Sequence, residues 1–371
     1  MTAVRVYLIG AGAIARFHAR ALPKLPADQV TLAVTDTHPA TLGEFARQFP
    51  DARVASDVAV LLAEPAEPND IVVVATPPAA HAPLTLAALA SGRHVLCEKP
   101  LALDMAQAGE MLRLARRQRR LLGCCSTRFL GLPTTEAVKQ LLRAGALGQP
   151  YHVTFVNRWQ RSRPGVEYQP TSSWFLDRSQ SGGGVVMDWG PYDMAVLNDL
   201  LAPIRVEVLG AWMVNPATAL PFGREVTFDV EEHAGASLRF HRADGSAVDV
   251  SYERAACTHV VERAEAEIAG RDGAASWDWL MWKRRGEVRF TRDQECKLVV
   301  ETTEHVDDGA IGYMDKPLYY FAQRVLGQPS PALIDEQALF NFACVRAIYD
   351  SAEIGRPQSV ARDGSQTLAT E

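Results

Sequence analysis

The first 125 residues alternate between short apolar runs and amphipathic segments. The apolar runs are rich in Val, Ile and Leu, and glycines or polar residues separate each run from the next segment. Continuous apolar runs with helices between them are typical of a parallel sheet that is covered on both faces. The pattern predicts strands at 4–9, 30–35, 71–76, 94–97 and 121–126, with helices that end near residue 22 and span about 41–49, 79–91 and 104–120.

The hydrophobic pattern changes near residue 150. The later segments alternate apolar and polar positions with few helices between them, which predicts a mostly antiparallel, open sheet with one exposed face. A helix over about 335–354 ends at Gly355, and the residues after it are expected to fray. We therefore expect two domains, 1–125 and 126–371, and the last helix is a candidate to pack on the first. The predicted later strands are 151–159, 204–212, 233–241, 246–253 and, more weakly, 258–270.

Composition and charge exclude some classes of protein. Hydrophobic residues make up 47% of the 371 residues, and the formal net charge is −6. This balance gives no reason to expect nucleic acid or an anionic membrane as partner. No apolar run reaches the roughly 18 residues of a membrane span. The N-terminal residues lack the pattern of a secretory signal, so we expect a cytoplasmic protein.

The six cysteines are scattered along the chain without CxxC spacing. In a cytoplasmic protein such residues are typically reduced and act as small apolar side chains. We therefore expect no zinc site and no other metal site.

A glycine-rich turn follows the first predicted strand and opens the first predicted helix. Its sequence, GAGAIA at 10–15, matches GxGxxG/A, in which the first glycine permits a tight turn and the second lets the backbone approach a pyrophosphate. The N-terminus of the helix supplies N–H groups and a partial positive charge for phosphates. The predicted dinucleotide-binding residues are Gly10, Ala11, Gly12, Ala13 and Ile14.

An acidic residue ends the second predicted strand. Asp36 lies 24 residues after Gly12, near the spacing of roughly 20 that dinucleotide-binding proteins use. Its carboxylate can accept hydrogen bonds from a ribose 2′-OH and would repel a 2′-phosphate. This favours NAD, with NADP as the alternative, since His38 nearby could lie beside a phosphate.

Three separated stretches together carry a family resemblance. They are GAGAIA (10–15), ATPPAAH…GRHVLCEKPLA (75–102) and SGGGVVMDWGPYDM (181–194), and they span about half of the chain in order. With these stretches the sequence resembles the Gfo/Idh/MocA oxidoreductases, a family that includes glucose-fructose oxidoreductase and inositol dehydrogenase. The resemblance implies a Rossmann domain and a C-terminal α+β domain. It also implies hydride transfer between NAD(P) and a sugar, cyclitol or related polyhydroxy compound, in a homodimer or homotetramer built on the strand-rich face.

This resemblance implies a role for the EKP sequence at 98–100. In such enzymes the lysine points from the end of the strand toward the nicotinamide and substrate, so Lys99 becomes a candidate catalytic and cofactor-binding residue. A lysine there can hydrogen-bond the reacting oxygen and favour its anionic form. Glu98 would orient the ammonium or hold the cofactor ribose, and Pro100 would fix the turn through a cis bond. The alternative is a surface ion pair that caps a strand.

The third stretch departs from the common family pattern. Many relatives have histidine four residues after the aspartate, whereas Tyr192 follows Asp188 here. The glucose-fructose oxidoreductase and dihydrodiol dehydrogenase branches resemble this version. A phenol beside a lysine can exchange protons, so Tyr192 is the candidate acid/base and Asp188 the candidate for binding a substrate hydroxyl. Tyr192 as a core aromatic residue is the alternative. The resemblance also suggests that Gly182 to Gly184 let a helix start close to the nicotinamide.

Other residues carry weaker predictions. Thr76 and Pro77 end a strand at the same edge as the glycine turn and are expected to contact the cofactor, as is His81, for which a structural role is the alternative. His18 is interpreted as a packing residue. The candidate substrate-binding residues are Arg128, Trp174 and Asp188, with Trp159, Arg161 and Arg163 as further candidates to line the pocket.

Two other classes of function remain open from the sequence. Some relatives use transient oxidation to assist glycosidic cleavage, so a NAD-dependent glycosidase is one alternative. A redox-inactive sensor that binds a dinucleotide is the other, although Lys99 and Tyr192 argue against it.

Overall fold

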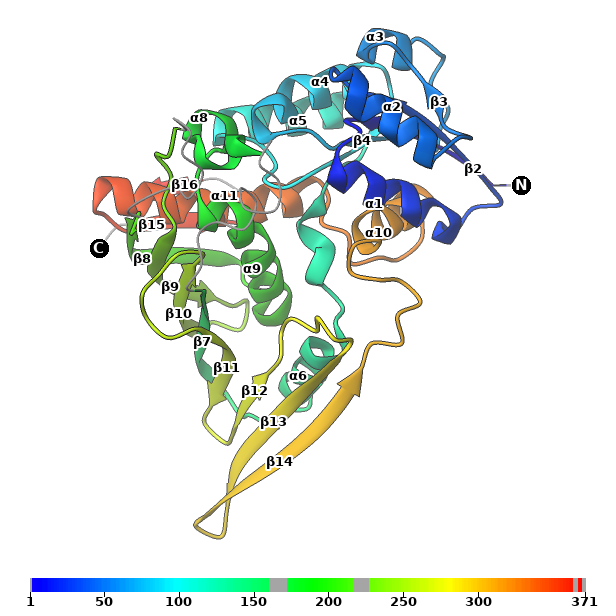
Figure 1. Cartoon of the computed structure of the whole chain (residues 1–371). Coiled ribbons are helices and arrows are strands. Elements are labelled where there is room, and N and C mark those ends of the chain that lie inside the picture. The colour runs from blue at the N-terminus through cyan, green and yellow to red at the C-terminus, as the bar shows by residue number, and fades with distance from the viewer. Residues whose placement is uncertain (1, 160–171, 217–226, 363–365, 369–371) are drawn as a thin grey trace. The chain divides into compact units, whose positions relative to one another are not determined.

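The computed structural model describes residues 2–159, 172–216, 227–362 and 366–368 (Figure 1). The chain forms two compact units. Unit 1 comprises 1–128, 179–182 and 311–342, and unit 2 comprises 129–178, 183–310 and 343–371. Arg161 and Arg163, which were candidates to line the pocket, lie outside the described residues.

Unit 1 contains a six-stranded sheet in which every pairing is parallel. The strand order is β3-β2-β1-β4-β5-β6, the arrangement of a dinucleotide-binding Rossmann fold. Strands β4 and β5 in the sheet are buried at every position, as the sequence pattern predicted. The strands are β1 (Ala3–Ile9), β2 (Gln29–Thr35), β3 (Arg53–Val54), β4 (Ile71–Val74), β5 (His94–Cys97) and β6 (Leu122–Cys124).

The helices between these strands begin and end where local chemistry allows. Asp104 caps the longest of them, because its side chain accepts a hydrogen bond from the Gln107 N–H at 2.8 Å. Gly92 follows another helix with a φ of +82°, a left-handed conformation that suits glycine. The helices are α1 (Ala13–Ala21), η1 (Leu22–Lys24), α2 (Pro39–Gln48), α3 (Val58–Leu61), η2 (Pro78–Ala80), α4 (His81–Ala90), α5 (Met105–Gln118) and η3 (Cys125–Phe129).

A distant helix, α10 (Lys316–Val325), completes the core of unit 1. Leu318, Phe321 and Ala322 are wholly buried in the cluster that β1, β4 and α1 also form. The ring of Phe321 packs against Gly123 of β6, where an added Cβ would lie 2.5 Å from a ring carbon. The sequence did not predict this helix. The helix α11 (Asp335–Ile354) begins in unit 1 and ends in unit 2.

Unit 2 contains a ten-stranded sheet in the order β14-β13-β12-β11-β7-β10-β9-β8-β15-β16. Among the described strands of this ten-stranded sheet, only β7 and β10 pair in parallel. The predicted α/β architecture, with a Rossmann sheet and a mostly antiparallel second sheet, is therefore confirmed. The strands are β7 (Pro150–Arg158), β8 (Arg205–Val214), β9 (His233–His241), β10 (Ala247–Ala255), β11 (Arg263–Gly270), β12 (Ala274–Trp277), β13 (Arg285–Gln294), β14 (Lys297–Val306), β15 (Gln358–Ala361) and β16 (Gln366–Leu368).

The end of the chain corrects one prediction. Helix α11 spans the predicted residues and stops before Gly355, whose φ is +69°. The chain does not fray there, because β15 pairs with β8 in antiparallel fashion and Val360 is wholly buried. Tertiary pairing that no local pattern reveals thus orders this segment.

Helices pack on unit 2 as well, and one of them carries the third sequence motif. Helix α9 packs against β9 and β10 and is buried over most of its length. No helix within the described ranges is long and apolar enough to cross a membrane. The remaining helices are α6 (Pro133–Arg143), η4 (Ser173–Leu176), α8 (Arg178–Ser181) and α9 (Val185–Leu201).

Candidate active site and cofactor site

The two glycines in the glycine turn of unit 1 have different surroundings. Gly10 has a φ of +106°, and a Cβ on it would lie 2.4 Å from the carbonyl oxygen of Ala75, so no larger residue fits. Gly12 caps α1, and a Cβ on it would meet no atom within 4 Å. The backbone at Gly12 is therefore open on the side where a phosphate would approach. The first turn of α1, at Ala13 and Ile14, has no side-chain cap.

Asp36 links the ends of β1 and β2. Its Oδ2 accepts a hydrogen bond from the Ala11 N–H at 2.7 Å, and its Oδ1 accepts one from the His38 N–H at 2.7 Å. A carboxylate has about four acceptor sites, so both oxygens can still receive bonds from ribose hydroxyls. The structure thus holds the predicted acidic residue rigidly beside the glycine turn.

His81 connects the loops that follow β4 and β5. Its Nδ1 lies 2.7 Å from the carbonyl oxygen of Pro100, and its Nε2 lies 2.9 Å from that of Thr76. Burial lowers the pKa of His81, and the two carbonyls oppose the shift. The side chain is wholly buried, which agrees with the structural alternative, while its contact with a cofactor stays a prediction.

The end of β4 offers a further group to a ligand. The hydroxyl of Thr76 is buried and has no hydrogen-bond partner among the described residues, whereas Pro77 is exposed. A buried hydroxyl normally has a partner. Together with the open backbone at Gly12 and the uncapped start of α1, this orphaned hydroxyl fits a bound dinucleotide.

Glu98, at the end of β5, is the centre of a buried polar network. Its Oε1 lies 2.9 Å from His18 Nε2 and accepts a hydrogen bond from Arg128 Nη2 at 3.0 Å. Its Oε2 accepts one from the Lys99 N–H at 3.1 Å. Burial raises the pKa of Glu98, but Arg128 and His18 outweigh it, so the net shift is downward and the carboxylate stays ionised.

The network fixes the backbone from which Lys99 projects. The Lys99–Pro100 peptide bond is cis, as the resemblance implied. Arg128, a candidate for substrate binding, is 6% exposed and engages Glu98. His18, interpreted from the sequence as a packing residue, is buried and also contacts Glu98. The sequence did not reveal this link, because 80 residues separate the two side chains.

His18, Glu98 and Cys125 lie close enough together to suggest a metal site, since one potential ligand atom of each falls within 4.8 Å of the others. The chemistry of the group does not favour it. The Arg128 guanidinium already forms an ion pair with Glu98. Burial raises the pKa of the Cys125 thiol, which disfavours the thiolate that a metal needs. All six cysteines are free, and five of them are buried.

Asp188 and Tyr192 lie on helix α9 in unit 2, whereas Lys99 belongs to unit 1. Asp188 and Tyr192 are four residues apart and therefore share a face of the helix. Asp188 is half-buried, and Tyr192 is 4% exposed, with its ring edge-on to Phe129 at a centroid distance of 5.0 Å. Trp174, a substrate candidate, stacks on Phe175 in η4 with centroids 3.9 Å apart.

Asp193, next to Tyr192, anchors the middle of α9 to the sheet. Arg254 Nε donates to Asp193 Oδ2 at 3.0 Å, its Nη2 donates to Oδ1, and the Tyr252 hydroxyl donates to Oδ2 at 2.8 Å. Both charged side chains are wholly buried. Burial raises the pKa of Asp193, and Arg254 opposes the shift. The guanidinium also lies over three indole rings, those of Trp159, Trp189 and Trp279.

A Rossmann sheet with an open glycine turn and an acidic residue at the end of β2 is typical of a dinucleotide-binding protein. Residues 4–124 match the oxidoreductase family with an NAD-binding Rossmann fold, and 135–276 match the GFO/IDH/MocA C-terminal domain. The chain therefore belongs to the Gfo/Idh/MocA oxidoreductase family, as the resemblance indicated.

Named relatives and solved structures agree with this membership. The chain is 25% identical over 287 residues to D-xylose 1-dehydrogenase [NADP(+)] of Haloarcula marismortui, covering 76% of this chain and 72% of the relative. It is 28% identical over 276 residues to inositol 2-dehydrogenase of Rhizobium meliloti, covering 74% and 75%. The fold resembles an oxidoreductase from Agrobacterium radiobacter solved with NAD+, L-tartaric acid and magnesium, with a TM-score of 0.71 and 20% identity over 96% and 98% of the two chains.

Proposed function

We propose that this oxidoreductase transfers a hydride between NAD(H) and a carbinol or carbonyl carbon of a sugar, cyclitol or related polyhydroxy compound. The chemistry of the named relatives supports the substrate class. The observation that carries the proposal is the buried network in which Glu98 holds the Lys99 backbone at the carboxyl end of β5. Ligands of open parallel sheets bind at this edge.

The cofactor would be held by the groups at the ends of β1, β2 and β4. The open backbone at Gly12 and the start of α1 suit the pyrophosphate, and Thr76 and Glu98 offer polar atoms nearby. Asp36 favours NAD over NADP because it would repel a 2′-phosphate. When bound, the nicotinamide ring takes up or gives the hydride.

The protein supplies charge and proton transfer. In this proposal the Lys99 ammonium donates a hydrogen bond to the reacting oxygen and stabilises it as an alkoxide. Tyr192, ionised as a phenolate, takes the hydroxyl proton during oxidation and, as a phenol, returns it during reduction. Asp188 accepts a hydrogen bond from a neighbouring substrate hydroxyl.

A dehydrogenase screen tests the function. We expect the purified protein to reduce NAD in the presence of at least one sugar, inositol or sugar acid, and to prefer NAD to NADP. Absorbance of the reduced nicotinamide measures turnover. A strong NADP preference would contradict the role of Asp36. Release of a free sugar from a glycoside without net NADH would select a glycosidase, and dinucleotide binding without turnover across the screen would select a sensor.

We also propose that the protein is a cytoplasmic homo-oligomer built on the outer face of the ten-stranded sheet. Trp212 and Val214 are 48% and 46% exposed there, beside a groove of about 440 Å³ that Gly210 and Gly235 help to line. Opposite charges on this face are paired, as in Arg239 with Asp249. A second copy of the same face would therefore meet no net repulsion.

Substitution of Trp212 by Glu is expected to convert the oligomer into a monomer, because each copy would carry a charge into a buried, apolar contact. Light scattering after size-exclusion chromatography measures the mass against the 40.6 kDa of one chain. Val54→Glu is the matched control, since Val54 is 45% exposed but lies in unit 1. A wild-type protein with the mass of a single chain would rule the interface out.

A further inference from the structure

We infer that Glu231 and Tyr349 are positioning residues that fix the start of α9 and thereby place Asp188 and Tyr192 for catalysis. The inference rests on the proposed function, because it concerns the two α9 residues that the proposal assigns to the substrate. Glu231 lies outside the sequence stretches that carry the family resemblance. Glu231 and Tyr349 both lie in unit 2 with α9.

Four consecutive N–H groups at the start of α9 bind these two residues. The Gly184 N–H donates to Glu231 Oε2 at 2.8 Å, and the Val186 N–H donates to Oε1 at 3.0 Å. The Val185 N–H donates to the backbone carbonyl of Glu231 at 3.0 Å. The Met187 N–H donates to the Tyr349 hydroxyl at 2.9 Å. The N–H groups that a helix leaves without intrahelical partners are thus satisfied by residues at least 45 positions away along the chain.

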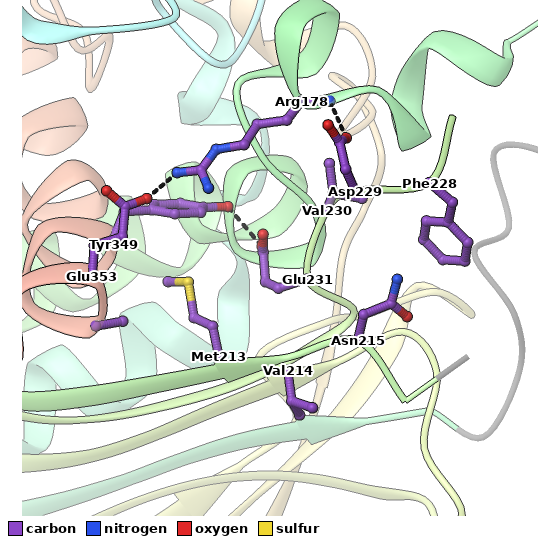
Figure 2. A pocket seen from close by; sticks show the side chains of 11 residues that line it. Arg178, Met213, Val214, Asn215, Phe228, Asp229, Val230, Glu231, Tyr349 and Glu353 are labelled. Atoms are coloured by element: carbon purple, nitrogen blue, oxygen red, sulfur yellow. Dashed lines mark hydrogen bonds and ion pairs between the residues drawn. The ribbon is translucent and has the colours of Figure 1, made fainter. Parts of the chain in front are cut away.

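The two capping residues are also bonded to each other. The Tyr349 hydroxyl donates to Glu231 Oε1 at 2.6 Å (Figure 2). The same hydroxyl accepts the hydrogen bond from the Met187 N–H, so it links the helix to the carboxylate. Tyr349 is 1% exposed, and the guanidinium of Arg346, also on α11, lies over its ring at 5.1 Å from the centroid. The negative charge of Glu231 faces the positive end of the helix dipole, which stabilises this arrangement.

The glycine run of the third motif is explained by this cap. A Cβ on Gly184 would lie 1.7 Å from the carbonyl oxygen of Glu231, and a Cβ on Gly183 would lie 2.2 Å from the Tyr349 hydroxyl. Both positions therefore need glycine so that protein groups can reach the start of the helix. The structure shows these glycines making room for Glu231 and Tyr349.

The cap is directly coupled to the candidate catalytic residues. The Asp188 N–H makes the first intrahelical hydrogen bond, to the Gly184 carbonyl at 2.9 Å, and Tyr192 follows about one turn later. Asp193 holds the next position through Arg254. Asp188 and Tyr192 thus lie between two fixed points, and a shift at the first point would move them along or around the helix axis.

A pocket of about 370 Å³ lies beside the cap, and Glu231 and Tyr349 form part of its wall (Figure 2). Arg178 and Glu353 form an ion pair in the same wall without contacting the start of α9. Because there is space next to both capping side chains, isosteric substitutions need not overpack the core. Glu353 therefore provides a control in the same pocket.

The test compares Glu231→Gln and Tyr349→Phe with Glu353→Gln in the full-length protein. We expect kcat to fall on the order of 10- to 100-fold for Glu231→Gln, since small displacements of reacting groups cost this much. Tyr349→Phe should cause a smaller loss, and Glu353→Gln should stay within about twofold of wild type, because exposed ion pairs contribute little. The dissociation constant for NADH, whose predicted site lies in unit 1, should not change in any variant.

A kinetic readout separates positioning from loss of folded protein. The deuterium isotope effect on kcat should rise in Glu231→Gln, because misplaced α9 residues slow the chemical step, whereas a smaller folded fraction would leave it unchanged. If the wild-type protein is active and both capping variants keep its kcat and its isotope effect, the inference is overturned while the proposed function stands. An inactive wild type across the substrate screen would overturn the proposed function and the inference with it.

Discussion

Substitution of Lys99 by Met is expected to lower kcat/KM for the sugar or cyclitol substrate by about 10²- to 10³-fold, whereas the affinity for NADH should change far less. Met preserves most of the length and the apolar stem of Lys but removes its charge. Steady-state turnover and fluorescence titration with NADH measure the two quantities separately.

The expected size follows from what the ammonium contributes to the transition state. Hydride loss leaves a negative charge on the substrate oxygen, and a positioned donor is worth about 10²–10³-fold in rate at such a charge. Glu98 remains ionised and bonded to Arg128 and His18, so the surrounding network is expected to persist in the variant.

Lys139→Met provides the matched control. Lys139 binds Glu136 and Asp199 on unit 2 and takes no part in the proposed site, so its variant should retain nearly full activity. Retention of more than about a tenth of wild-type kcat/KM by Lys99→Met would be incompatible with an electrophilic role for Lys99.

The sequence predicted the parts of the fold that local patterns encode. Buried parallel strands are continuous apolar runs, and the glycine turn and the capping Asp104 have local signatures. Strands β13 and β14 were missed, although β13 alternates exposed and buried positions in its first half; β14 is exposed at most positions and has no such alternation. Figure 1 shows these two strands as a long hairpin.

The predicted site residues were those that lie within recognisable motifs. The contacts that hold them in place were missed, because Arg128, Arg254 and Glu231 make these contacts across long sequence separations. One signal was available for Asp193, which is the only charged residue between positions 189 and 197 of the sequence. A charge there implies a buried partner, but the identity of Arg254 as that partner follows only from the fold.

Removal of Arg254 is expected to have the largest effect on stability. The Arg254→Leu substitution leaves the Asp193 carboxylate wholly buried without its countercharge, and breaking a buried ion pair in this way typically costs about 3–5 kcal/mol. The free energy of unfolding, from denaturant titration, measures the loss. Arg254→Met combined with Asp193→Asn is the control, since it removes both charges and lets Tyr252 keep an acceptor. This double variant should be markedly more stable than Arg254→Leu.

The loss in Arg254→Leu should depend on pH with a definite sign. Burial already raises the pKa of Asp193, and without the guanidinium the folded-state pKa rises further above the unfolded value of about 3.9. The folded variant therefore binds a proton at a pH where the unfolded chain does not, so its stability increases as the pH falls. The difference in unfolding free energy between wild type and Arg254→Leu should be smaller at about pH 5 than at about pH 8. A difference that stays constant, or that widens toward low pH, would show that Asp193 is not left ionised and unpaired in the variant.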